Sequence, residues 1–319
     1  MIPYDSIVVL GPTASGKTKF AVNLAEKLCD YKAEIISADS RQVYRNMDIG
    51  TGKDLCEYNN IPYHLINVVE AGTKYNIFSY QKDFSKVYSD MLCRGAFPII
   101  CGGSGLYIQA VTCSYDLKDV PPDNDLRNRL EAKSMEELIQ LFMEMKQKRG
   151  EAPHNITDFD TKHRIIRAIE IERAYVESSM QCDNNVSRLL LPKNVLYLGI
   201  DVDREERNRR IDLRLAARLK EGMVEEVKKL LNSGIKPEDL IYYGLEYKFI
   251  TQYIIGILKY DEMVEKLAIA IHQFAKRQMT WFRGMERKGI KIWWSRDGIG
   301  FYNNFDDVKV ELNDLLSLK

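Results

Sequence analysis

The sequence predicts an α/β protein in which helices cover both faces of a parallel sheet. Short apolar runs of strand length alternate with helical patterns through the first hundred residues, as expected of strands joined by crossover helices. The runs carry few polar positions, which is typical of strands buried on both faces. These runs are SIVVLG, AEIISADS, YHLINVVE and FPIICGG. The helical patterns lie between Lys17 and about Cys29 and within FSYQKDFSKVYSDMLCRG.

The pattern changes after GGSGLYIQAV, because residues 116–190 show two or three helical segments and no strand-like run. A strand pattern returns at NVLYLGIDVD, residues 194–203. We therefore expect a core formed by 1–115 plus 191–319, interrupted by a helical insertion domain at 116–190.

The C-terminal part of the core is predicted to be helical from Arg204 to Gly289. Turn-forming residues interrupt this pattern near Asn232-Ser233-Gly234 and around Tyr243-Gly244. A short strand, IKIWW, follows at 290–294.

Composition sets limits on partners and compartment. Lys plus Arg equals Asp plus Glu at 46 each, so any nucleic-acid surface has to be a local patch. The six cysteines are scattered without a C-x-x-C pair, which indicates a reducing compartment and argues against zinc. The sequence shows no signal-peptide pattern and no apolar run of membrane-spanning length. We expect a cytoplasmic protein without a membrane partner.

One motif carries clear chemistry. The segment GPTASGKT fits the phosphate-binding pattern G-x-x-x-x-G-K-[ST], and it follows an apolar strand and opens a helix. In such a loop the backbone N–H groups surround phosphate oxygens at a helix N-terminus. Lys17 supplies a positive charge, and the Thr18 hydroxyl is a candidate ligand for Mg²⁺. The candidate diphosphate- or nucleotide-binding residues are Gly11, Pro12, Thr13, Ala14, Ser15, Gly16, Lys17 and Thr18. The fold class is thus an α/β core like that of P-loop NTPases.

The motif alone favours a nucleotide kinase or NTPase, but the sequence lacks one feature of those enzymes. The candidate strand for a second magnesium-binding carboxylate, FPIICGGSGLY, ends in glycine and serine. Asp39, by contrast, follows the second strand, at the sheet edge where ligands bind. Its position fits a general base and a turn or helix-cap residue about equally.

The sequence resembles the tRNA dimethylallyltransferase family along nearly its whole length. The motifs that carry the resemblance occur in the family's order: GPTASGKT (11–18), ISADSRQVYRNMDIGTGK (36–53), IPYHLINVVE (61–70), GGSGLY (102–107), HRIIRAIEIE (163–172), DREERNRRIDLR (203–214) and AKRQMTWFRG (275–284). Members transfer a five-carbon group from dimethylallyl diphosphate to the exocyclic amine of the adenosine 3′ of the anticodon.

The resemblance implies that the loop holds an isoprenoid diphosphate as a leaving group, with Mg²⁺ at Thr18. It assigns catalytic roles to Asp39 as general base, to Lys17, to Ser104 at a position where the family most often has Thr, and to Arg127. A lone arginine on a helix, however, is more often solvated or salt-bridged.

The resemblance also implies a tRNA anticodon stem-loop as partner. The implied contact residues are Asp39, Ser40, Arg41, Gln42, His163, Arg164, Ile165, Ile166, Arg167, Lys276, Arg277 and Arg283. Four further arginines at 207, 210, 214 and 218 share one helical stripe, but interleaved carboxylates make intrahelical pairing equally plausible. We expect the protein to act as a monomer.

Two positions depart from the family pattern. YYGLEYKF has Leu245-Glu246 where a tyrosine and a basic residue are usual, and Ile271-His272 replaces Thr-Arg. A divergent paralogue with altered preference or lower activity fits these departures. Three alternatives remain open: an adenylate isopentenyltransferase acting on free nucleotides, a small-molecule P-loop kinase, and a tRNA-binding protein without activity.

Overall fold

The computed structural model describes residues 4–113, 115, 117–148, 161–179 and 189–295. Contacts divide the chain into two compact units, one formed by 1–115 with 190–319 and one by 116–189. Within the described ranges, no helix is both long and apolar enough to cross a bilayer. The five described cysteines are all free thiols.

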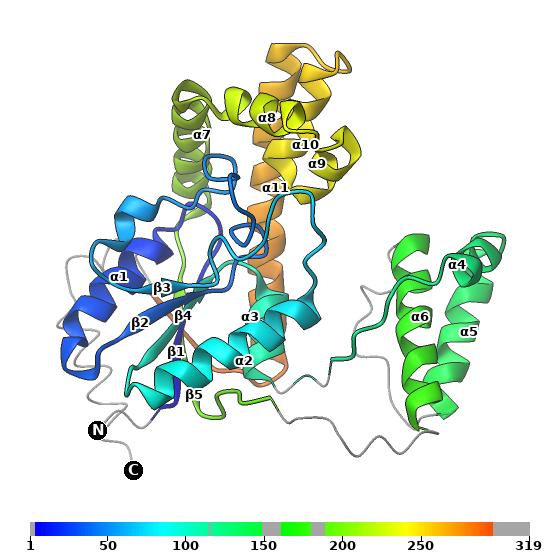
Figure 1. The fold of residues 1–319 in the computed structure, drawn as a ribbon, viewed down its shortest axis with the longest axis horizontal. Helices are drawn as coiled ribbons and strands as arrows, with labels where there is room; N and C mark the ends of the chain where they lie inside the picture. The colour runs from blue at the N-terminus through cyan, green and yellow to red at the C-terminus, as the bar shows by residue number, and fades with distance from the viewer. Residues whose placement is uncertain (1–3, 114, 116, 149–160, 180–188, 296–319) are drawn as a thin grey trace. The chain divides into compact units, whose positions relative to one another are not determined.

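The first unit is built on a six-stranded, all-parallel sheet in the order β3-β2-β4-β1-β5-β6, which confirms the predicted α/β class (Figure 1). Its strands are β1 (Ser6–Leu10), β2 (Glu34–Ser37), β3 (Tyr63–His64), β4 (Pro98–Gly102), β5 (Val195–Ile200) and β6 (Ile292–Ser295). Because β1 pairs with β4 on one side and β5 on the other, its carboxyl end lies in the middle of the sheet edge.

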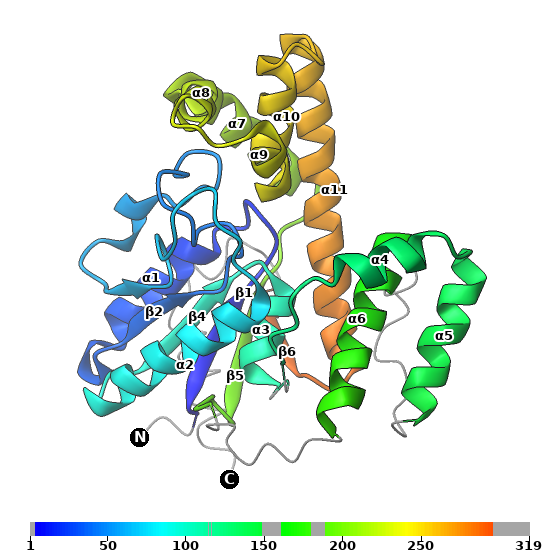
Figure 2. The same ribbon diagram turned by 45° about the vertical axis from the view of Figure 1, so that its right-hand side comes forward.

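Side chains alternate between two apolar layers. Ile7 and Val9 of β1 pack with α1 (Lys17–Lys27) on one face. On the other face, Val8 and Leu10 share a core with α2 (Ile77–Cys93) and α3 (Gly105–Thr112). Figure 2 shows α2 and α3 together on that face. Burial on both faces explains why the strands have continuous apolar sequences.

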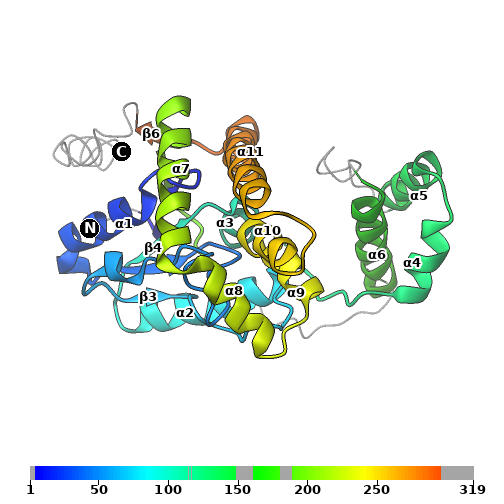
Figure 3. The same ribbon diagram turned by 90° about the horizontal axis from the view of Figure 1, so that it is seen from above.

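Between β5 and β6 the described chain forms five helices. They are α7 (Arg204–Glu221), α8 (Met223–Asn232), α9 (Pro237–Tyr243), α10 (Leu245–Ile254) and α11 (Tyr260–Arg287). The predicted interruptions near 232–234 and 243–244 fall at two of the boundaries. Two further boundaries, at Gly222 and at 255–259, were not predicted. α7 packs along α11, as seen from above in Figure 3.

The predicted strand within YHLINVVE is much shorter than its apolar pattern suggested. β3 contains only Tyr63 and His64, because Leu65 (φ 60°) and Asn67 (φ 57°) adopt the left-handed conformation. Val69 returns to form one isolated bridge with Tyr44. Two 3₁₀ turns, Cys29–Tyr31 and Leu55–Tyr58, complete the described elements of the unit.

The second unit is helical in its described part. It contains α4 (Asn124–Glu131), α5 (Met135–Lys148) and α6 (Lys162–Ser179), and no strand is present among its described residues. Its core is separate from those of the sheet: Leu130, Leu138, Phe142, Ile165, Ile166 and Ile169.

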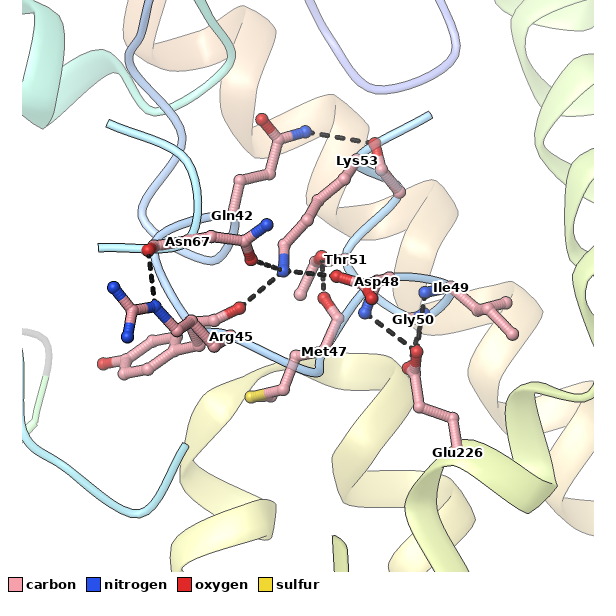
Figure 4. Close-up of polar contacts among 12 residues, drawn as sticks. Gln42, Arg45, Met47, Asp48, Ile49, Gly50, Thr51, Lys53, Asn67 and Glu226 are labelled. Atoms are coloured by element: carbon pink, nitrogen blue, oxygen red, sulfur yellow. Dashed lines mark hydrogen bonds and ion pairs between the residues drawn. The ribbon is translucent and has the colours of Figure 1, made fainter. Parts of the chain in front are cut away.

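A polar network fixes the loop 47–53 that follows β2 (Figure 4). The carboxylate of Glu226, on α8, accepts the backbone N–H groups of Asp48, Ile49 and Gly50 at 2.8, 2.8 and 3.0 Å. The Tyr247 hydroxyl also donates to Glu226, at 2.6 Å. This carboxylate therefore links the loop to the C-terminal helices.

Lys53 anchors the other end of the same loop. Its side chain is 1% exposed, and Nζ donates to the Tyr44 carbonyl, to Asp48 Oδ1 and to Asn67 Oδ1 at 2.5–2.6 Å. Burial lowers the pKa of Lys53, while the hydrogen bond that Lys53 donates to Asp48 opposes that shift. Three oxygen acceptors compensate the buried ammonium group.

Replacing Glu226 by Ala should destabilise the protein. The change leaves three backbone donors and a tyrosine hydroxyl without their acceptor, a loss on the order of 2 kcal/mol. The adjacent Glu225→Ala variant removes an exposed carboxylate and should change stability by no more than about 0.5 kcal/mol. Urea denaturation of both variants measures the difference; equal free energies of unfolding would contradict the role given to Glu226.

Candidate active site

The phosphate-binding loop lies between β1 and α1, as the motif predicted. Gly16 immediately precedes the helix with a φ of 86°, in the left-handed conformation that glycine adopts without strain. Ala14 is also left-handed, at φ 61°. This backbone turns the loop's N–H groups and the N-terminus of α1 towards the same space, an arrangement that favours anions.

Lys17 and Thr18 form the first turn of α1 and line a cavity above the loop. Lys17 Nζ donates to the Pro12 carbonyl at 3.4 Å. Burial lowers the pKa of Lys17, and the nearby Cys101 and Asp39 partly offset this shift. An anion entering the cavity would restore the stabilisation that the ammonium group lacks.

Asp39 follows β2 and lines the same cavity. Its Oδ1 accepts the backbone N–H of Arg41 at 2.9 Å, so the carboxylate is oriented by a local turn. Asp39 can therefore be a turn residue and a candidate general base at once, because its carboxylate accepts the Arg41 N–H and also lines the cavity.

Ser104 holds the turn that carries Asp39. Its Oγ accepts the Ser40 backbone N–H at 3.1 Å, and its own N–H donates to the Ala38 carbonyl at 3.3 Å. The preceding Gly102 permits this approach, since a Cβ there would lie 2.1 Å from the Ala38 carbonyl oxygen. The GGSG segment thus joins the ends of β2 and β4.

The cavity has a volume of about 800 Å³ and lies wholly within the first unit. It brings together Lys17, Thr18 and most of the loop with Asp39, Ser40, Arg41, Gln42, Ser104 and Arg277. Gln42 is fixed there by Ser37 Oγ at 3.0 Å and by its own donation to the Gly52 carbonyl at 3.0 Å. Predicted residues from three strand ends therefore meet in one space.

Two arginines of α7 extend the cationic surface of this cavity. Arg214 bonds to the Thr13 hydroxyl, and its burial, followed by the proximity of Arg218, lowers its pKa to about 10. Arg218 pairs with Asp54 at 2.9 Å. Glu246, at the position that departs from the family pattern, lines the same cavity, and burial raises its pKa.

Gln278, on α11, connects the two glycine-containing loops. It is 8% exposed; its Oε1 accepts the Thr13 N–H at 2.8 Å, and its Nε2 donates to the Gly103 carbonyl at 2.9 Å. One turn later, Trp281 packs over Gly105 and donates from Nε1 to Gln109 at 2.9 Å. One face of α11 therefore sets the spacing between the phosphate loop and the end of β4.

Other predicted residues lie outside this cavity. Gly11, Pro12 and Ser15 shape the loop beneath it, whereas Lys276 and Arg283 line a second cavity between α7 and α11. In the arginine stripe, Arg210 pairs with Glu206 at 2.7 Å, so pairing accounts for part of that row.

Arg127 and the stretch from His163 to Arg167 belong to the second unit. Arg127 forms a two-point ion pair with the buried Glu170 at 2.7 and 2.9 Å, and Arg167 bonds to the same carboxylate at 2.9 Å. The side chains of Ile165 and Ile166 are in the core, at 0% and 2% exposed. His163 and Arg164 are exposed. The geometry gives Arg127 a structural ion pair, and its catalytic role stays a prediction.

The site defines a class of protein: a P-loop α/β protein in which a carboxylate that follows β2 lines the same cavity as the phosphate loop. The IPP transferase family model matches residues 42–285, and the chain belongs to this family. It is 56% identical, over 92% of its length and 93% of the relative's, to tRNA dimethylallyltransferase 1 of Parabacteroides distasonis. Identity with tRNA dimethylallyltransferase 2 of Bacteroides fragilis is 50%, covering 98% of this chain and 100% of the relative.

A solved structure gives the same result for the fold. The tRNA isopentenylpyrophosphate transferase of Bacillus halodurans superimposes with a TM-score of 0.67 and 29% identity, covering 97% of each chain. The predicted family is thus confirmed by sequence and by structure.

Sequence reasoning missed Gln278, Arg214 as a loop contact, and the network around Lys53 and Glu226. Gln278 lies inside the AKRQMTWFRG segment, but nothing in the sequence of this segment indicates that its amide joins the loops that contain Thr13 and Gly103. The partners are 265 and 175 residues away in the chain, so no local pattern marks them.

Gln278→Leu should weaken diphosphate binding about tenfold, because it removes both hydrogen bonds and leaves the Thr13 N–H and the Gly103 carbonyl without partners. Calorimetric titration with inorganic diphosphate measures the dissociation constant. Gln140→Leu, at an exposed position of α5 that lines neither cavity, is the matched control. An unchanged dissociation constant for Gln278→Leu, with the fold intact, would remove Gln278 from the site.

Proposed function

We propose that the protein transfers a dimethylallyl group from dimethylallyl diphosphate to N6 of the adenosine 3′-adjacent to the anticodon in tRNA, and releases diphosphate. One observation carries the proposal: Asp39 faces the phosphate loop across a single cavity, while β4 ends in Gly102 with no carboxylate following it. This arrangement suits transfer of carbon to a nucleophile better than transfer of a phosphoryl group. The names of the relatives support the same reaction.

The leaving group would be stabilised by cations and backbone donors. When the allylic C–O bond breaks, its electron pair remains on the diphosphate. Lys17, Arg214 and the N–H groups at the start of α1 surround the position where this charge develops. Burial lowers the pKa of Lys17 and of Arg214, so an anion in the cavity would stabilise the charged forms of both groups.

The metal is proposed to be Mg²⁺. Thr18 places a hydroxyl on the cavity wall, and no cluster of three metal-ligating side chains is found among the described residues. Such a sparse donor set fits Mg²⁺, which keeps several waters and binds mainly through substrate phosphates. When bound, the metal supplies charge neutralisation to the departing diphosphate.

Asp39 would act on the acceptor. An exocyclic adenine amine is a weak nucleophile, so removal of its N–H proton as the C–N bond forms lowers the barrier. The proton passes to the Asp39 carboxylate, whose orientation is fixed by Arg41 N–H and by the Ser104–Ser40 contact. Ser104 acts in this scheme by positioning the turn.

The target base would enter beside Ser40, Arg41 and Gln42. The Arg41 guanidinium lies 5.7 Å from the ring centre of the exposed Tyr242, and both residues line the cavity. A planar cation and an aromatic ring are suitable surfaces for an unstacked base. His163, Arg164 and Arg167 of the second unit are proposed as further RNA contacts, as are Lys276, Arg277 and Arg283 on α11.

A transfer assay separates the alternatives. Purified protein is incubated with labelled dimethylallyl diphosphate, Mg²⁺, and either an anticodon stem-loop RNA or AMP. Label on the RNA is the expected result. Label on AMP would identify an adenylate isopentenyltransferase, and RNA binding without transfer would identify an inactive binder. A parallel incubation with ATP in place of dimethylallyl diphosphate would reveal a kinase by phosphoryl transfer.

Asp39→Asn should reduce the transfer rate by about 10²- to 10⁴-fold. Asparagine keeps an oxygen acceptor for the Arg41 N–H, so the turn is preserved while the base is lost. Single-turnover kinetics with saturating RNA measure the rate, and diphosphate affinity provides the control for an intact loop. Retention of the wild-type rate would exclude Asp39 as the base.

A further inference from the structure

A second cavity of about 660 Å³ opens between the start of α7 and the C-terminal half of α11. It shares no lining residue with the cavity above the phosphate loop. Its lining includes four cationic side chains, those of Arg204, Arg207, Lys276 and Arg283, against two carboxylates, Asp201 and Asp203.

Arg207 is the unusual member of this group. It is only 8% exposed, and its Nε is buried without a hydrogen-bond partner among the described residues. A buried guanidinium is normally paired with a carboxylate or several carbonyl oxygens, because desolvation is costly. The acceptor that Arg207 Nε lacks among the described residues is expected to come from a ligand.

The other cations of the cavity are also unpaired. Within the part of the chain that the structure describes, the side chains of Arg204, Lys276 and Arg283 have no ion pair. By contrast, Arg209 and Arg210 of α7 both bond to Glu206. Three cations without an ion pair therefore line the cavity together with Arg207.

The two carboxylates do not neutralise this excess. Asp203 caps α7 by accepting the Glu205 N–H at 2.9 Å, and Asp201 accepts the Val202 N–H at 2.9 Å. Four cations face two carboxylates that are already engaged with backbone donors, so the cavity favours an anion.

We propose that this second cavity binds a phosphate group of the substrate RNA backbone, with Arg207 as its buried anchor. Guanidinium groups donate in a planar fork that matches phosphate oxygens. The inference rests on the proposed function, which makes RNA the substrate, and it adds Arg204 and Arg207 to the contacts that the family resemblance implies. Binding here is separate from diphosphate binding at the loop.

The test measures the dissociation constant of an anticodon stem-loop RNA as a function of NaCl concentration. Arg207→Gln should weaken binding about tenfold at low salt. It should also reduce the slope of log K against log [NaCl] by about 0.7–0.9, the value for one lost phosphate contact. Lys276→Gln changes an exposed cavity residue and should act in the same direction, which keeps the test valid if Arg207→Gln fails to fold. Arg209→Gln, an exposed arginine of α7 outside the cavity, should leave affinity and slope unchanged.

A second arm distinguishes the source of the phosphate. Inorganic phosphate is titrated against the wild type and Arg207→Gln while the thermal midpoint is followed. Unchanged RNA affinity and salt slope in both cavity variants would overturn the proposal. If phosphate stabilises the wild type alone while RNA binding is unaffected, the site serves a free anion and the RNA source is wrong. If the wild type binds no RNA at all, the result contradicts the proposed function, on which this inference rests.

Discussion

The close approach of three strand ends is the constraint on which the site depends. Gly102 and Gly103 have no side chain, so the end of β4 can touch the turn after β2 on one side and the phosphate loop's partner, Gln278, on the other. A Cβ at Gly102 would collide with the Ala38 carbonyl, and one at Gly103 would lie 2.4 Å from Gln278 Nε2. The separation between Asp39 after β2 and the loop after β1 is thus set by the backbone contact at Gly102 and by the Gln278 amide.

The cavity above the phosphate loop is also lined by charged side chains of both signs. Cations lie where phosphate is expected, at the start of α1 and along α7, while Asp54, Glu57 and Glu246 add carboxylates to the lining of the same cavity. Burial disfavours the charged forms of Lys17, Arg214 and Glu246 alike. Glu246 places a carboxylate on this wall at the position where the family resemblance predicts a basic residue.

Local sequence patterns predicted the strands of the sheet, the phosphate loop and some helix boundaries, because each depends on near neighbours in the chain. Apolar runs mark β1 and β4, and Gly16 with Lys17 marks the start of α1. The short β3 was over-predicted, since left-handed residues at 65 and 67 are not visible in an apolar run. The family resemblance identified Asp39, whose spacing alone left two interpretations. Contacts between distant segments, such as Gln278 with Thr13 or Glu226 with the loop 47–53, had no signature in the sequence, because they arise from how α8 and α11 pack.

The Glu226 network has a consequence for anion selectivity. The segment DIGTGK resembles a glycine-rich phosphate-binding loop. The backbone N–H groups of Asp48, Ile49 and Gly50 converge on one point (Figure 4). That point is occupied by the protein's own carboxylate, which acts as an intramolecular ligand. These three amides are therefore closed to an external anion, although converging backbone N–H groups of this kind otherwise form an anion-binding nest.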